Sequence, residues 1–167
     1  MRHFILLLAT LTCSLDLQAG EAVAELHRID AQGMGASIGT ITIREVPGGL
    51  EFMPRLSGLP AGPHGFHLHE TGACEPGEKD GKVQAGLAAG SHYDPDKSGK
   101  HLGPQGAGHK GDLPALTVAA DGNASTPVIA SRLTMADVQG RALIVHAEPD
   151  NYADQPGGAR IACGVIH

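Results

Sequence analysis

Residues 65–70 read Gly-Phe-His-Leu-His-Glu (GFHLHE), an alternation of apolar and polar side chains that indicates a β-strand. Side chains two positions apart on a strand share a face, so His67 and His69 point one way while Phe66 and Leu68 enter a core. Two neutral imidazoles on one strand face can reach a single metal ion, and imidazole suits copper and zinc. Exposed strand positions also carry histidine by chance, so this stretch alone leaves both interpretations open.

The same alternation recurs along the chain and predicts an all-β fold. Aromatic residues make up 3% of the sequence, whereas glycine (24) and proline (11) are frequent, as is typical of short strands joined by turns. The candidate strands are residues 23–31, 36–46, 50–56, 64–70, 115–119, 125–133, 142–146 and 160–166. They indicate an eight-stranded β-sandwich or flattened barrel with Greek-key connections. One short helix is expected to start at Thr134, with Asp137 completing a capping box.

The first residues are predicted to be a leader rather than part of the fold. A basic start and the apolar run 4–11 resemble a secretory signal peptide, and this run is too short to span a membrane. Cleavage is expected after Ala19, with Ala24 as the alternative. Residues 1–19 would then be a cleaved signal peptide, and residues 20–167 a single exported domain that does not insert stably in a membrane.

Two of the three cysteines remain after removal of such a leader, because Cys13 falls within it. In an oxidising compartment, Cys74 and Cys163 would most simply form one disulfide. A pair of buried free thiols is the alternative.

Residues 71–114 form an unusually long stretch without a recognisable strand or helix. Loops beyond about 12–15 residues are uncommon unless they are functional or disordered. This one carries His92, His101, His109 and Asp112 in the spacing His-x8-His-x7-His-x2-Asp. It has few apolar residues to offset its ordering entropy, so a bound metal is expected to organise it. A disordered surface insertion is the alternative.

The histidines of residues 65–70 and of the long loop, together with His146, suggest two metal sites. Seven metal-competent groups exceed the four that one tetrahedral zinc takes. Two four-ligand sites that share one residue need seven residues, which matches this number.

Several motifs in a fixed order resemble one family. The sequences GFHLHE, GSHYDP, KHLGPQGAGHKGDLPAL, IVHAEPDN and GGARIACGVIH closely resemble copper–zinc superoxide dismutase in its exported bacterial form. The resemblance runs from about Val23 to the C-terminus. It implies an eight-stranded Greek-key β-barrel with long metal-binding and active-site loops, one copper and one zinc per subunit, a periplasmic location, and a monomer or homodimer that dismutes superoxide.

The resemblance also implies a role for individual residues. The copper ligands would be His67, His69, His92 and His146. The zinc ligands would be His92, His101, His109 and Asp112, with His92 bridging the two ions. Asp150 would link His67 to His101, and Cys74 would pair with Cys163. Arg160 would receive the anionic substrate beside copper, and His92 would carry a proton during turnover.

One departure and two rival functions qualify this resemblance. Only Gln-Pro-Gly-Gly-Ala separates Asp154 from Arg160. This segment is shorter than in bacterial relatives, so the rim of the active-site channel is expected to be reshaped.

A metal-storage protein would need no cation beside its metal, so Arg160 argues against that function. An adhesion or structural sandwich would not need the ordered motifs.

The charge pattern bears on partners. A net charge of -6 argues against nucleic acid, because no general basic surface is available to meet phosphates. All lysines nevertheless fall within the long loop, at Lys79, Lys82, Lys97, Lys100 and Lys110. Such a concentration can steer an anion toward a site, although lysines also favour solvated loops.

Overall fold

A computed structural model of the chain describes residues 20–152 and 157–167. The predicted signal peptide, residues 1–19, lies outside the described residues, as does part of the short segment before Arg160. Among the described residues, no helix combines the length and hydropathy that a membrane span requires.

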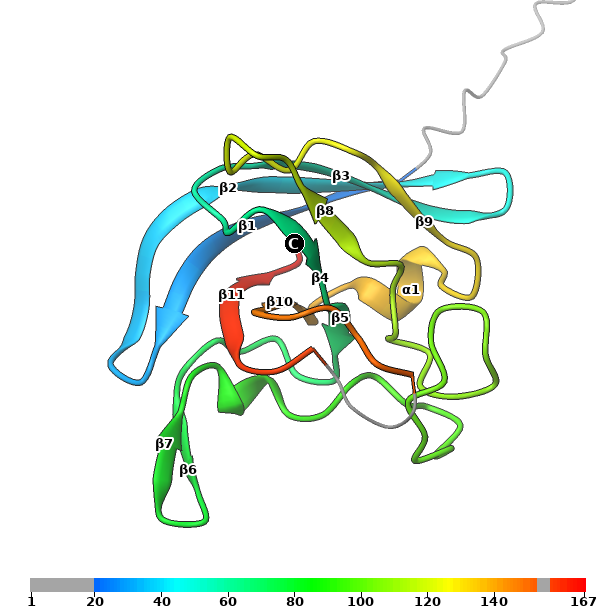
Figure 1. The fold of residues 1–167 in the computed structure, drawn as a ribbon. Coiled ribbons are helices and arrows are strands. Elements are labelled where there is room, and N and C mark those ends of the chain that lie inside the picture. The colour runs from blue at the N-terminus through cyan, green and yellow to red at the C-terminus, as the bar shows by residue number, and fades with distance from the viewer. Residues whose placement is uncertain (1–19, 153–156) are drawn as a thin grey trace, which may run out of the picture.

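The main element is a seven-stranded antiparallel sheet that curls around the core (Figure 1). In spatial order its strands are β5 (Phe66–His69), β10 (Ala142–His146), β11 (Arg160–Val165), β1 (Glu21–Asp30), β2 (Gly33–Val46), β3 (Gly49–Leu56) and β9 (Val128–Ala130). The first strand lies between its sequence neighbour β2 and the C-terminal strand β11. The predicted all-β barrel fold is confirmed.

A second pair, β4 (Gly62–His64) and β8 (Leu116–Val118), lies outside this sheet. The predicted strand 64–70 is therefore divided in two, because the chain stops pairing with β8 and begins pairing with β10 at Gly65. A Cβ atom at Gly65 would lie 2.7 Å from the Asp150 carboxylate. Only glycine fits this close approach, and the break brings Asp150 against the start of β5.

The core fills the inside of the curled sheet. Phe52 of β3 and Phe66 of β5 meet edge to face with ring centroids 5.9 Å apart, an arrangement that aromatic pairs favour. Phe66 and Leu68 are fully buried, as their strand pattern predicts. His67 and His69 are fully buried as well, because the rings of His92 and His101 from the long loop lie against His67, with ring centroids 3.9 and 5.4 Å away. The histidine face of this strand is thus an interior surface.

The long loop contains regular structure that the sequence analysis did not predict. It forms a hairpin of β6 (Gly77–Lys79) and β7 (Lys82–Gln84), followed by a 3-10 helix, η1 (Leu87–Ala89). Asp80 and Gly81 connect the two strands with φ values of 55° and 71°. An Asp-Gly pair with positive φ at both residues is a favoured two-residue hairpin turn. Figure 1 shows the hairpin projecting from the barrel.

The one α-helix of the described chain is α1 (Met135–Val138). Its capping box is confirmed: the Thr134 backbone N–H donates to the Asp137 carboxylate, and the Thr134 side chain accepts from the Asp137 backbone N–H.

The predicted disulfide is also confirmed. Cys74 and Cys163 are bonded, with their Cα atoms 5.8 Å apart and a sequence separation of 89. Both residues are buried, and the bond joins the start of the long loop to β11.

Removing this disulfide should lower the free energy of unfolding by roughly 2–5 kcal/mol, because a crosslink across so long a segment restricts the unfolded chain. The measurement is denaturant unfolding of a Cys74→Ala/Cys163→Ala variant beside oxidised and reduced wild-type protein. The variant should match the reduced protein. A variant as stable as the oxidised protein would contradict this expectation.

Candidate metal centre

Two neighbouring strands bring three histidines together. His67 and His69 share one face of β5, and His146 ends β10 beside them. The pairing of β10 with β11 shifts register between Val145 and His146. Such irregularities re-aim side chains near functional sites, and the rings of His67 and His146 lie 4.6 Å apart.

Each of these rings is held by one nitrogen. His67 Nε2 lies 2.9 Å from an Asp150 carboxylate oxygen. His69 Nδ1 donates to the Gly90 carbonyl at 3.0 Å, and His146 Nδ1 donates to the Gly158 carbonyl at 2.9 Å. The second nitrogen of each ring is buried and has no hydrogen-bond partner. Metal-binding histidines show this pattern, in which one nitrogen is oriented by an acceptor and the other faces the ion.

The protonation of these rings suits metal binding. Burial lowers the pKa of His67 and of His69 well below the ordinary value, and it lowers the pKa of His146 to about 4. The rings are therefore neutral near pH 7 and offer a lone pair. One ligand atom from each, together with one from His92, lies within 4.8 Å of all the others. Four imidazoles around one point suit copper or zinc.

A second group surrounds Asp112. Its Oδ1 atom lies 2.8 Å from His92 Nδ1, 3.0 Å from His101 Nδ1 and 3.5 Å from His109 Nδ1. Ligands about 2.0–2.1 Å from a tetrahedral zinc lie roughly 3.3 Å from one another. The Nδ1 atoms of His101 and His109 lack hydrogen-bond geometry despite this proximity. The group thus has the spacing of co-ligands around an ion.

The charge of Asp112 fits the same role. Burial alone would raise its pKa, but the hydrogen bond from His92 and the neighbouring His101 lower it below the ordinary value. Asp112 is therefore an ionised carboxylate whose negative charge is available to a cation.

The four donor residues that lie within 4.8 Å of one another around Asp112 are His67, His92, His101 and Asp112. His109 falls outside this set, although the resemblance assigns it to zinc. His67 already has Nε2 bound to Asp150, and its free Nδ1 faces the first group. His109 has its Nδ1 directed at Asp112. His92 belongs to both groups.

Asp150 lies between the two groups. Its carboxylate contacts His67 Nε2 at 2.9 Å and lies 3.5 Å from His101 Nε2. The backbone N–H of Gly157 also donates to it. A carboxylate that fixes rings from two sites sets both orientations at once.

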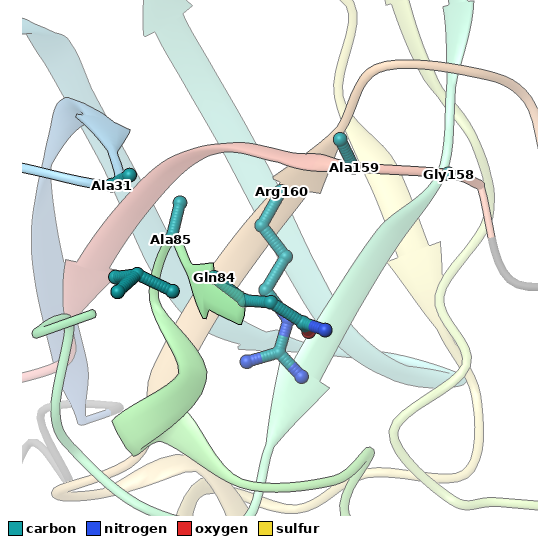
Figure 2. A pocket seen from close by; sticks show the side chains of 7 residues that line it. Ala31, Gln84, Ala85, Gly158, Ala159 and Arg160 are labelled. Carbon is teal, nitrogen blue, oxygen red and sulfur yellow. The ribbon is translucent and has the colours of Figure 1, made fainter. Parts of the chain in front are cut away.

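Arg160 begins β11 and lies beside the first group. Its guanidinium donates to the backbone carbonyls of Gly86 and Gly90, and the Gly90 carbonyl also accepts from His69. A pocket of about 390 Å³ opens here. Its lining residues are Ala31, Val83, Gln84, Ala85, Gly158, Ala159 and Arg160. In Figure 2, the side chains of Gln84 and Arg160 extend into the same space.

Comparison with known proteins agrees with this geometry. The family profile described as copper/zinc superoxide dismutase (SODC) matches residues 37–166. The chain belongs to the copper/zinc superoxide dismutase family. It is 49% identical to the Cu-Zn superoxide dismutase of Escherichia coli over 172 aligned positions, which cover 99% of each chain. It is 52% identical to the enzyme of Brucella abortus, over 89% of each chain.

Solved structures give the same result. The Cu/Zn superoxide dismutase from Brucella abortus matches with a TM-score of 0.86 at 47% identity, over 89% of this chain and 100% of that one. The monomeric copper, zinc enzyme from Salmonella enterica matches with a TM-score of 0.80 at 49% identity, with the same coverage. The chain is thus an enzyme, a superoxide dismutase of the copper–zinc type.

Sequence reasoning missed the part of this dismutase that bounds the pocket. The β6–β7 hairpin supplies Val83 and Gln84 to the lining, and neither residue was a candidate. The Asp80-Gly81 pair was the available signal for the hairpin. No sequence signal marks Gln84, because its position depends on how the loop folds back toward Arg160.

Proposed function

We propose that the enzyme dismutes superoxide with copper held by the first histidine group and zinc held around Asp112. The copper ligands are His67, His69, His92 and His146. The zinc ligands are His92, His101, His109 and Asp112. The observation that carries this proposal is the set of buried ring nitrogens without partners, since each leaves an unpaired polar atom where an ion would satisfy it.

The different roles proposed for copper and zinc follow from the ligands of each metal. Bound copper supplies the one-electron redox cycle by which one superoxide becomes O2 and a second, with two protons, becomes hydrogen peroxide. Four neutral imidazoles suit that metal, whereas the ionised Asp112 suits zinc. Zinc would also order the loop that covers the histidine face of β5.

The protein contributes attraction, orientation and proton handling. Arg160 presents a fixed positive charge to the pocket, and its guanidinium is held by two carbonyls so that it does not reorganise when an anion arrives. His92 Nδ1 lies 2.8 Å from Asp112 Oδ1, on the side of the proposed zinc site. Its Nε2 is then the ring atom that can take up and release a proton beside the substrate.

Metal analysis combined with a superoxide-decay assay tests the proposal. Purified protein should contain one copper and one zinc per chain and should accelerate superoxide decay. Chelation should abolish the activity, and copper added to the zinc-loaded protein should restore it. Loaded protein that leaves the decay rate unchanged would refute the proposal.

We further propose export to the periplasm after cleavage at Ala19. The disulfide suits an oxidising compartment, and Ala24 is a buried residue of β1, which begins at Glu21. Cleavage at Ala24 would remove part of a strand that pairs with β2. The mature protein should therefore begin at Gly20, and N-terminal sequencing of the periplasmic fraction tests this. Gel filtration of the same material would distinguish a monomer from a homodimer.

The lysines of the hairpin are proposed to steer superoxide. Lys79 and Lys82 are cross-strand partners, an arrangement of like charges that costs stability. Lys82 shares a strand face with Gln84, which lines the Arg160 pocket. Lys110, in contrast, is paired with Asp137 at 2.8 Å.

A Lys79→Glu/Lys82→Glu variant should therefore be slower than wild type at low salt. Both rates should converge as salt rises, because the screening length falls from about 10 Å at 0.1 M to about 3 Å at 1 M. Stopped-flow superoxide decay measures this, with Arg55→Glu on the exposed side of β3 as a charge reversal away from the hairpin. Equal rates for double variant and wild type at low salt would exclude these two lysines from steering.

A further inference from the structure

Asp137 makes more contacts than a helix cap requires. In the capping box this carboxylate accepts from the Thr134 backbone N–H at 2.8 Å, and the Thr134 hydroxyl donates to it as well at 2.7 Å. The same carboxylate also accepts the Tyr93 hydroxyl at 3.0 Å and the Lys110 ammonium at 2.8 Å. Both additional donors come from the long loop.

These two donors directly follow two of the proposed zinc ligands in the sequence. Tyr93 succeeds His92, and Lys110 succeeds His109. The two segments also meet through the backbone, because the N–H of Gly111 donates to the Tyr93 carbonyl at 2.8 Å. One carboxylate on α1 thus holds the neighbours of two ligands that come from distant parts of the loop.

Other residues of the segment after β9 reinforce this contact. Arg132 donates to the backbone carbonyl of His109 at 3.1 Å and to that of Gly108 at 2.8 Å. Arg141 lies over the Tyr93 ring, with its guanidinium carbon 3.9 Å from the ring centroid. Its Nε also donates to the Asp137 carbonyl at 2.7 Å. Segment and loop therefore form one hydrogen-bonded unit outside the metal groups.

We propose that Asp137 is a positioning residue for the zinc site, and this rests on the proposed assignment of His92 and His109 as ligands. By holding Tyr93 and Lys110 together, it fixes the separation of these histidines, whose rings lie 5.3 Å apart. Both Nδ1 atoms must reach one ion with Asp112, and a small shift of either segment would move a donor out of range. The carboxylate acts through the backbone, with no contact to either imidazole in the structure.

The test is the zinc affinity of the metal-free protein, measured by competition with a chelator, together with the visible spectrum of Co(II) in the zinc site. Asp137→Ala should weaken zinc binding by about tenfold, the lower end of what outer partners of metal ligands contribute. Its Co(II) bands should shift, because the ligand geometry changes. Tyr93→Phe and Lys110→Met should each weaken binding less. Combining Tyr93→Phe with Asp137→Ala should add nothing to Asp137→Ala alone.

Thr134→Ala is the matched control. It removes one capping hydrogen bond to the same carboxylate but leaves both loop contacts in place. It should lower the melting temperature without changing zinc affinity or the Co(II) spectrum. If Thr134→Ala weakens zinc binding as much as Asp137→Ala, or if Asp137→Ala binds zinc like the wild type, Asp137 is only a cap and the proposal is overturned.

A His109→Ala variant distinguishes a wrong role for Asp137 from a wrong assignment of His109 as a zinc ligand. Loss of zinc by His109→Ala with unchanged binding by Asp137→Ala overturns the role of Asp137 alone. Retention of wild-type zinc affinity by His109→Ala overturns the assignment, and with it the positioning role.

Discussion

An Arg160→Ala variant is expected to keep copper and zinc but to lose about 10- to 100-fold in kcat/KM for superoxide. Arg160 is partly buried and bounds the pocket beside the first histidine group. Because charges act more strongly where water is excluded, one cation here contributes more than an exposed one would. Metal content and stopped-flow superoxide decay on the same preparation measure both parts of the expectation.

Two further substitutions separate the effect of the Arg160 charge from the effect of its hydrogen bonds to the loop. Arg160 also holds the carbonyls of Gly86 and Gly90, so alanine removes loop contacts together with the charge. Arg160→Lys keeps the charge but lacks the planar fork that reaches both carbonyls, whereas Arg160→Gln loses the charge. If attraction of the anion dominates, the lysine variant will be faster than the glutamine variant. Equal rates would assign the effect to the loop, and full activity of Arg160→Ala would remove the residue from the mechanism.

The strand at residues 65–70 shows which structural features the alternation of apolar and polar residues can predict and which it cannot. Alternation placed Phe66 and Leu68 in the core and the two histidines together on the other face, as the structure has them. It could not indicate that the histidine face is buried, since its cover comes from the loop that follows. Nor could it indicate the break at Gly65, where the pairing partner changes and Asp150, distant in sequence, approaches the backbone.

The candidate metal site could also be predicted only in part from the sequence. Residue types and their spacing predicted two metal sites sharing a ligand, because seven donors in one chain exceed one tetrahedral set, and the structure has two groups of donors that could hold a metal. The acceptors that orient His69 and His146 are the backbone carbonyls of Gly90 and Gly158, which no side-chain pattern reveals. The hydrogen bond between Asp137 and Tyr93 could not be predicted from the sequence either, because the two residues are distant in sequence and meet only in the folded chain.

An Asp112→Ala variant is expected to have the largest effect on metal binding and stability. Asp112 is the one carboxylate among the proposed ligands, and its Oδ1 lies within 3.5 Å of three imidazole nitrogens. Loss of an outer-shell partner alone costs 10- to 100-fold in metal affinity, so loss of this ligand should weaken zinc binding by more than about 100-fold. Copper should remain, because its proposed ligands are untouched.

Zinc loss should then release the loop. Residues 71–114 have few apolar side chains to hold them, so the variant should unfold at lower temperature and be cleaved by proteases within this segment. Asp96→Ala removes an exposed carboxylate of the same loop and should retain zinc, stability and protease resistance. Excess zinc should partly restore the melting temperature of Asp112→Ala, since a ligand that binds the folded state stabilises it by mass action. Zinc-free Asp112→Ala whose loop resists proteolysis like the wild type would show that the hydrogen bonds to Asp137 and the disulfide order this segment without the metal.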